Sequence, residues 1–453
     1  MDRIDELGNE PVSKLLWKYS LPPIVGMIVF ASYNIVDRYF VGQALGAIGN
    51  SAITVLYPMT IVLMAFGMLC GFGGTSLVSI SFGEQKRDYA ARVIGTTFLI
   101  NTIISGVILI FSYIYLEEVI IALGGNDEVM QLAKDYGSVI IMGAIFGQTS
   151  FAMNNMIRSL GSPLTSMMTM LISAILNIIL NPLFIMGLGM GIKGSAWATV
   201  ISQIVSCVWV VWFYISKRNP LRLNRSHFKF DFSIIKRVFG IGSSSFFIQI
   251  GGSIIAAMFN HLLNYYSGSE SIAIYGISVA VLLFVMMPVF GLNQGAQPIV
   301  GYNFGAKNYG RVQEALRISL IVATLICTVG CIGVILFSRE IMSGFLHDNP
   351  AVVDLGTHGI TIFSITLPVV GMQVIASGYY QSIGMSGRAV VLTLLRQVIV
   401  LIPLLIILPP IFGLEGVWFS PPIADFVSAA MTAYFLIREI RKLSNLHLEN
   451  GAA

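Results

Sequence analysis

Hydrophobic residues run along this chain in long stretches, and short segments rich in glycine, proline and charged residues separate them. Runs such as residues 94–115 are long enough to span the hydrocarbon core of a bilayer as a helix. They lack the alternation of apolar and polar residues that a transmembrane β-barrel requires. The pattern predicts an all-α polytopic membrane protein whose twelve transmembrane helices lie near residues 16–41, 51–81, 92–115, 130–158, 163–187, 193–216, 238–263, 272–302, 312–337, 351–382, 388–412 and 416–440.

The composition agrees with a membrane-embedded chain. Hydrophobic residues make up 56% of the 453 residues and charged residues only 11%, and the mean hydropathy is +0.82. Soluble domains carry about 25% charged residues, so a water-soluble globular protein is excluded.

The distribution of lysine and arginine predicts the orientation. With a cytoplasmic N-terminus, the inner segments hold 21 basic residues and the outer loops hold only Lys134, Lys193 and Arg339. Cytoplasmic loops of membrane proteins carry such an excess, and one missed or invented helix would abolish it. We therefore expect a multi-pass protein of the cell membrane with both termini in the cytoplasm.

The two halves of the chain share landmarks at a nearly constant offset. Phe82-Gly83 matches Phe304-Gly305 at an offset of 222, and Ser159-Leu160-Gly161 matches Ser382-Ile383-Gly384 at 223. Six helices per repeat is an even number, so both halves insert in the same direction, as in transporters that rock two parallel halves about a central site. The sequence predicts two parallel six-helix repeats: an N-lobe (1–216), a cytoplasmic basic linker (217–237) and a C-lobe (238–453).

Short polar motifs punctuate five of the helices. They are Asn34–Gly42, Asn177–Phe184, Gln294–Pro298 followed by Tyr302–Gly305, Leu395–Gln397 and Pro422–Asp425. Together they resemble the multidrug and toxic compound extrusion (MATE) family over essentially the whole chain. The resemblance implies a two-lobed antiporter that exports cationic amphipathic drugs or toxic compounds by alternating access, in exchange for H⁺ or Na⁺. Flippases for lipid-linked saccharides belong to the same superfamily and are the alternative.

Two acids, Asp37 and Asp425, lie well inside predicted helices, where an ionised side chain is costly and usually faces a cavity or a partner. Arg38 projects about 100° away from Asp37 around the helix, so it cannot easily neutralise that carboxylate. Asp37 is therefore the candidate coupling residue. The alternative is that Asp37 and Arg38 form a pair at the outer interface.

Two predicted helices present polar stripes. Each carries three polar residues at intervals of four positions: Ser173, Asn177 and Asn181 in helix 5, and Ser195, Thr199 and Gln203 in helix 6. Carboxylate, amide and hydroxyl oxygens that converge in a water-poor site can hold a hard cation, or can surround a carboxyl group that takes up a proton. The alternative is that the stripes only join helices. The predicted coupling-ion or proton site comprises Asp37, Asn177, Asn181 and Thr199.

The resemblance also exposes two departures from related proteins. In archaeal and DinF-like members of the family an Asp follows the helix 5 Asn by one turn, whereas this chain has Asn181 there. NorM-like members carry acids in helices 7 and 10, at positions that align with Gln249 and Val370. The N-lobe site thus has one carboxylate fewer than the first group, and the C-lobe lacks the acids of the second.

The C-lobe has its own intramembrane charges, Arg396 in helix 11 and Asp425 in helix 12. We expect an ion pair, because each charge relieves the cost of burying the other. The pair could be a structural lock, a gate or a second coupling site. The polar residues proposed for substrate contact in this lobe are Gln249, Gln294, Gln297, Arg396 and Asp425.

Enzyme motifs are lacking: the sequence has no Gly-Lys-Ser/Thr and no His-Glu-x-x-His. We therefore expect no catalysis, no metal and no cofactor other than the coupling ion, H⁺ or Na⁺. The expected partners are small cationic or amphipathic molecules and membrane lipid, without nucleic acid, and the protein is expected to act as a monomer. Arg38 and Arg396 are the two arginines well inside the membrane, too few for a pyrophosphate-linked cargo.

Overall fold

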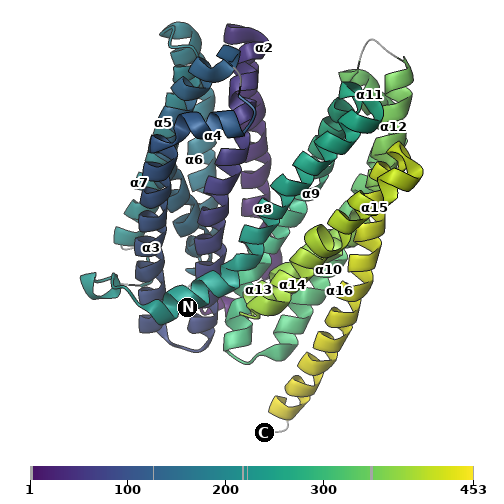
Figure 1. Cartoon of the computed structure of the whole chain (residues 1–453). Coiled ribbons are helices and arrows are strands. Elements are labelled where there is room, and N and C mark those ends of the chain that lie inside the picture. The colour runs from purple at the N-terminus through teal and green to yellow at the C-terminus, as the bar shows by residue number, and fades with distance from the viewer. Residues whose placement is uncertain (1–3, 126, 217–218, 222, 347–349, 452–453) are drawn as a thin grey trace. The chain divides into compact units, whose positions relative to one another are not determined.

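The computed structural model describes residues 4–125, 127–216, 219–221, 223–346 and 350–451. Over these residues the chain is almost entirely helical, and none of them lies in a β-strand. Residues 217, 218 and 222 of the predicted linker lie outside the described residues. The chain divides into two compact units, Met1–Glu10 with Val25–Phe246 and Pro11–Ile24 with Phe247–Ala453 (Figure 1).

The first unit consists of helices that run side by side. They are α1 (Glu6–Asn9), most of α2 (Val12–Gly83), α3 (Arg87–Ile114), α4 (Leu116–Ala122), α5 (Asp127–Ser159), α6 (Pro163–Pro182), the π-helix η1 (Leu183–Gly187), α7 (Ile192–Ile215), the 3₁₀-helix η2 (Arg225–His227) and the start of α8 (Phe232–Ser267). Gly46 divides α2 into two membrane helices, because its φ of 64° interrupts the helical backbone. Glycine adopts such a conformation without steric cost.

The second unit contains the start of α2, the rest of α8 and the remaining elements. They are α9 (Ser269–Gly305), α10 (Tyr309–Leu336), α11 (Ser338–Phe345), α12 (Pro350–Ser364), α13 (Leu367–Ser382), α14 (Ser386–Leu394), the π-helix η3 (Leu395–Leu401), α15 (Ile402–Phe412) and α16 (Leu414–Gly451). Of the described helices, 10 are long and apolar enough to cross a membrane, and the bent pair α12 and α13 makes an eleventh span. Helix α16, which carries Asp425 and two prolines, has 38 residues and is long enough to be the twelfth. The prediction of twelve membrane helices is confirmed.

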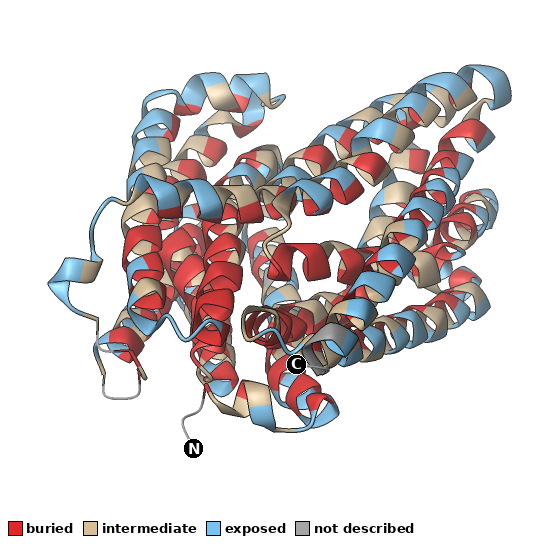
Figure 2. Ribbon diagram, turned by 90° about the horizontal axis from the view of Figure 1, so that it is seen from below, coloured by how far each residue is buried: buried red, intermediate tan, exposed pale blue. Residues whose placement is uncertain are grey.

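Helix α3 shows how side chains are distributed in these helices. Asn101 and Ser105 are almost completely buried, whereas Val107 is 61% and Ile114 is 65% exposed. The buried polar groups find partners in α5, where Gln148 accepts a hydrogen bond of 2.6 Å from Ser105. Figure 2 shows buried residues inside the helix groups and exposed ones on their outer sides. Polar groups inside and apolar groups outside are the arrangement that a lipid environment requires.

The backbone confirms that the two six-helix repeats are related. Helices α3 and α10 each have 28 residues and start 222 positions apart. In the part of the chain that the structure describes, the non-glycine residues with positive φ are Gln85 (60°) and Lys307 (59°), again 222 positions apart. Gly191 and Gly413 share another unusual conformation, with φ and ψ of 57° and −135° in one and 61° and −136° in the other. Equivalent loops therefore fold in the same way in both halves.

The structure adds two short helices that the hydropathy pattern did not predict, α4 and α11. They begin at Leu116 and Ser338, at the repeat offset of 222. Each is too short to form a membrane span, so a search for long apolar runs overlooks it. Both begin just after α3 or α10, which makes the short helix part of the repeated unit.

The two repeats share an equivalent close contact between an asparagine and a glycine, but the two residue types are exchanged. In the first unit Asn155 of α5 packs on Gly71 of α2, where an added Cβ would lie 3.3 Å from Asn155 Nδ2. In the second unit Asn293 of α9 packs on Gly378 of α13, and an added Cβ there would overlap Asn293 Oδ1. Residue 293 is the repeat equivalent of 71, and 378 is that of 155. Each helix crossing thus has one bulky polar partner and one glycine.

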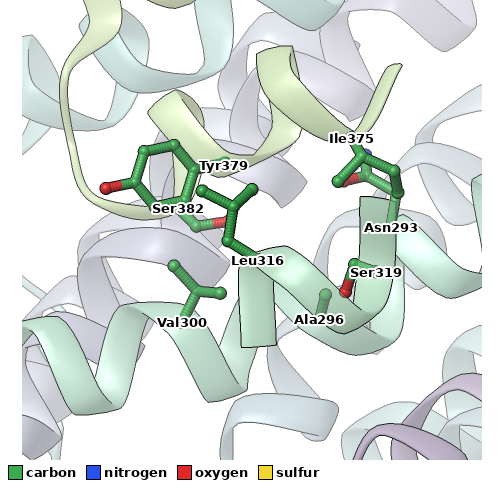
Figure 3. Close-up of a pocket in the computed structure, with 8 residues that line it drawn as sticks. All are labelled: Asn293, Ala296, Val300, Leu316, Ser319, Ile375, Tyr379 and Ser382. Atoms are coloured by element: carbon green, nitrogen blue, oxygen red, sulfur yellow. The ribbon is translucent and has the colours of Figure 1, made fainter. Parts of the chain in front are cut away.

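A small cavity lies beside the second of these contacts (Figure 3). Its lining residues are Asn293, Ala296, Val300, Leu316, Ser319, Ile375, Tyr379 and Ser382. At the equivalent place in the first unit, the sulfur of Met156 would lie 2.7 Å from a Cβ added to Gly74, so that space is filled. None of the residues predicted for coupling or substrate contact lines this cavity.

Candidate functional site

The N-lobe acid is buried among polar groups from other helices. Asp37 of α2 is 8% exposed, and Ser195 of α7 donates a hydrogen bond of 2.6 Å from Oγ to Asp37 Oδ1. The side chain of Asn181 from α6 lies beside this carboxylate as well. Helix α2 therefore meets α6 and α7, which follow much later in the sequence, at Asp37.

A chain of hydrogen bonds leads away from Asp37 along the predicted stripes. Asn181 Nδ2 donates to Asn177 Oδ1 over 3.0 Å, and Asn177 Nδ2 donates to Thr199 Oγ1 over 3.1 Å. The structure thus brings together all four residues selected from the sequence, with Ser195 as a fifth. Ser173 and Gln203, which continue the stripes, lie outside this chain of hydrogen bonds.

Arg38 does not pair with Asp37 in the structure. Its Nη1 donates to Thr54 Oγ1 over 3.2 Å, and its guanidinium lies 6.0 Å from the ring centroid of Tyr57. The ion pairs between described residues do not include Asp37. The alternative of an Asp37–Arg38 interface pair is therefore not what the structure shows.

A π-helical turn lies at each of the two candidate sites, the one around Asp37 and the one around Asp425. Pro182 follows Asn181 directly and has no N–H to donate, and the π-helix η1 begins at the next residue. In the second unit the π-helix η3 contains Arg396 itself. A π-helical turn widens the helix and turns its side chains out of register, and such turns are common at functional sites. Both candidate sites thus lie at a local break in helical regularity.

Asp425, the intramembrane acid of the C-lobe, forms an ion pair with an arginine. Arg396 Nε donates a hydrogen bond of 2.6 Å to Asp425 Oδ1, which confirms the expected pair. Thr366 Oγ1 donates to the other carboxylate oxygen over 2.8 Å, and Gln373 Nε2 donates to the backbone carbonyl of Asp425 over 2.8 Å. Asp425 is 6% exposed in its side chain and Arg396 is 35% exposed. Both oxygens of this carboxylate therefore have donors.

The glutamines selected in the C-lobe lie apart from these contacts. Gln249 is half-buried in α8, and Gln294 and Gln297 are buried in α9. The described contacts of Asp425 are with Arg396, Thr366 and Gln373 instead. Val370, at the position of a NorM-like acid, is buried in α13.

Sequence reasoning missed a third buried acid. Glu439 of α16 is 3% exposed and accepts a hydrogen bond of 2.5 Å from Arg388 Nη1. It stands near the end of the last predicted helix, among the basic residues of the C-terminal segment, so its burial was not evident. Tyr136 of α5, which lies near Asp37, was also missed.

The three acids that are buried among the described residues differ in how their charge is balanced. Asp425 and Glu439 each face an arginine, whereas Asp37 faces hydroxyl and amide groups. A carboxylate whose hydrogen-bonding partners are neutral can lose its charge to a proton or share it with a small cation, because no described arginine or lysine is paired with it. Within the described residues, no three His, Cys, Asp or Glu side chains cluster as a metal site would require.

The duplicated fold of twelve helices and the acid buried in its first half define a polytopic membrane protein of the transporter class. The family model MatE matches residues 22–183 and 244–407, one segment in each repeat. The chain belongs to this family, the MATE transporters.

Several known proteins resemble the whole chain. The multidrug export protein MepA of Staphylococcus aureus strain NCTC 8325 / PS 47 is 29% identical over 447 residues, which cover 98% of each chain. MepA of Staphylococcus haemolyticus strain JCSC1435 is 28% identical over 430 residues, 95% of this chain and 94% of that one. Among solved structures, the MATE multidrug transporter DinF-BH in complex with the dye rhodamine 6G is 35% identical, with a TM-score of 0.89 over 97% of this chain and 98% of the other. A multidrug resistance MATE transporter in an outward-facing conformation has a TM-score of 0.91 at 22% identity, covering 97% of this chain and 98% of that chain.

Proposed function

We propose that this chain exports cationic amphipathic compounds across the cell membrane in exchange for H⁺ or Na⁺, and that Asp37 is the coupling residue. The observation that carries the proposal is the environment of Asp37, a buried intramembrane carboxylate with neutral hydrogen-bonding partners. The names of the relatives, multidrug export protein and multidrug transporter, support the choice of cargo. The rhodamine dye in complex with the DinF-BH relative is the probe that this likeness suggests.

The coupling follows from differential binding. An ion can bias a transporter toward one conformation only if it binds the two conformations with different affinity. Protonation or cation binding changes the net charge at Asp37, and the hydrogen bond from Ser195 responds to that charge. Alternating access of an N-lobe (1–216) and a C-lobe (238–453), joined by a cytoplasmic linker, would then move the cargo. No cofactor is needed in this scheme, and a monomer suffices.

Charge balance supports a cationic cargo. Arg396 is neutralised by Asp425, and Arg38 is directed toward Thr54 and Tyr57. A pyrophosphate-linked saccharide would require several free cations in its path, which these contacts do not supply. An organic cation requires the opposite, an anionic or neutral polar route.

The test is export of the rhodamine dye from proteoliposomes that contain the purified full chain, with a proton gradient and a sodium gradient imposed separately. We expect one gradient to drive export and its collapse by a matching ionophore to stop it. Export that is equally fast without either gradient would overturn ion coupling. Failure to move this dye or any other organic cation under both gradients would overturn the proposed cargo class. The orientation is tested separately, by labelling single cysteines placed at each terminus in intact cells.

A further inference from the structure

The segment before α8 is folded onto α3. Thr96 Oγ1 donates a hydrogen bond of 3.0 Å to the backbone carbonyl of Lys229. The rings of Phe98 and Phe228 meet edge to face with centroids 5.9 Å apart. A Cβ at Gly95 would overlap the carbonyl of His227, so this glycine lets the segment lie directly on the helix. The predicted linker is thus a packed element over its second part.

His227 fixes the turn that leads into this segment. Its side chain is 11% exposed, its Nδ1 accepts a hydrogen bond of 3.0 Å from the backbone N–H of Asn224, and its Nε2 lies 3.2 Å from Asp88 Oδ1. Since Nδ1 is an acceptor, the ring proton is on Nε2, which donates to Asp88. One face of the segment is therefore held against α3, and the other face is turned outward.

The start of α8 is fixed in the same way. Asp231 Oδ1 accepts hydrogen bonds from the backbone N–H groups of Ser233 and Ile234, over 3.0 and 3.2 Å, and so caps the helix. Val238 packs on α2, where a Cβ at Gly73 would overlap its carbonyl. The carboxylate of Asp231 is thus occupied by the first backbone N–H groups of α8.

The outward face combines exposed cations with exposed aromatic rings. We call it the linker strip, and it comprises Arg225, Lys229, Phe230, Phe232 and Lys236. Phe230 is 61% and Phe232 is 81% exposed. The ion pairs of the described residues include none of the three cations of the strip. The strip is therefore a basic surface with two large apolar side chains in contact with its surroundings.

The position of the strip along α3 indicates what those surroundings are. The contacts of the linker run from Asp88, in the charged first turn of α3, to Phe98, within its apolar run. These residues are about 15 Å apart along the helix axis. Figure 1 shows this teal segment beside the beginning of α3. The level at which α3 changes from charged to apolar residues is where the headgroups of a bilayer meet its hydrocarbon core.

We propose that the linker strip binds acidic phospholipid headgroups of the leaflet that it faces. The rings of Phe230 and Phe232 enter the interface, and Arg225, Lys229 and Lys236 contact the phosphates. Phenylalanine side chains of interfacial segments are buried at the boundary between headgroups and acyl chains, and basic residues near the surface attract anionic lipid. An acidic soluble protein would match the charges but would leave both rings beside water or headgroups without an apolar partner. The inference concerns lipid binding and does not depend on the export function.

The experiment uses the full chain with Phe232→Trp, a substitution that the exposure of this side chain tolerates. The chain is reconstituted in vesicles of phosphatidylcholine and phosphatidylglycerol, with bromine on the acyl chains of one lipid or the other. The fluorescence of the unsubstituted chain is subtracted, because native tryptophans contribute. We expect brominated phosphatidylglycerol to quench the added tryptophan about twofold more strongly than brominated phosphatidylcholine.

Two further variants make the result decisive. Arg225→Gln/Lys229→Gln/Lys236→Gln, added to Phe232→Trp, should abolish the preference for phosphatidylglycerol. The matched control replaces the three basic residues of the predicted outer loops, each of which pairs with an acid. This variant, Lys134→Gln/Lys193→Gln/Arg339→Gln, should retain the preference. Equal quenching by both lipids in the parent, an unchanged preference in the first triple variant, or the absence of quenching would each overturn the proposal. Inorganic phosphate in the buffer should leave the preference in place.

Discussion

The hydroxyl of Ser195 in α7 donates a hydrogen bond of 2.6 Å to the carboxylate of Asp37 in α2, a residue 158 positions away in the sequence. A hydroxyl is a neutral donor, so it stabilises the charged carboxylate without removing its ability to change charge. At Asp425 the donor at the same distance is the guanidinium of Arg396. The intramembrane acid of the N-lobe therefore has a neutral donor, whereas that of the C-lobe is paired with a positive charge.

Neutralising Asp37 should separate transport from folding. In Asp37→Asn the amide oxygen can still accept the hydrogen bond from Ser195, so we expect a folded protein that still binds the rhodamine dye. Gradient-driven efflux should fall to background, because the charge that responds to the ion is gone. The matched control is Asp354→Asn, an exposed acid that pairs with Arg339. If Asp37→Asn pumps at the wild-type rate under the same gradient, the coupling site lies elsewhere.

Removing the hydroxyl of Ser195 should move the pH dependence of proton-driven efflux. Ser195→Ala loses a neutral donor that favours the charged carboxylate of Asp37, so the pH profile of efflux should shift to higher pH. Ser202→Ala is the control, since this buried hydroxyl of the same helix bonds only to Ala198 of its own backbone. A profile unchanged in both variants would exclude Ser195 as a positioning residue for Asp37.

The pair of Arg396 and Asp425 can be dissected by substitution. Each single alanine variant should lose about 3 kcal/mol of stability and express poorly, because it leaves a charge without a partner. The charge exchange Arg396→Asp/Asp425→Arg should recover folding in part. The apolar variant Arg396→Met/Asp425→Leu should fold but transport poorly, because the C-lobe then has no carboxylate at this site. Wild-type efflux by that variant would show that the pair is only a structural lock.

The exchanged asparagine and glycine give a test of packing. Gly378→Ala should lower the midpoint of thermal unfolding, with a loss of about 1–3 kcal/mol, because its Cβ overlaps Asn293. Combining Asn293→Gly with Gly378→Asn recreates the arrangement of the first repeat and should restore much of that stability. Gly276→Ala is the control in the same unit: a Cβ there meets nothing within 4 Å, so helix propensity alone should act. Equal midpoints for Gly378→Ala and Gly276→Ala would contradict the overlap.

Much of the fold was predictable from hydropathy, because each membrane helix is long and the repeats share loop landmarks. The N-lobe site was also predictable: Asn177, Asn181 and Thr199 follow helical spacing, and Asp37 is an isolated intramembrane acid. Spacing within one helix cannot show which helices meet, so the part played by Ser195 at Asp37 required the structure. The same limit hid the contact of Asn293 with Gly378, because neither residue type is unusual in a membrane helix.

The neutralisation of Asp425 by Arg396 has an electrical consequence for the proposed exchange. If Asp37 alone changes its charge during a cycle, one proton enters for each monovalent organic cation that leaves, and no net charge crosses the membrane. The membrane potential would then do no work on that cargo, and the pH difference would be the whole driving force. A divalent cargo would carry one uncompensated charge, against a potential worth about 2.3 kcal/mol per charge for each 100 mV. The valence of the cargo would thus set how strongly its export responds to the energetic state of the cell.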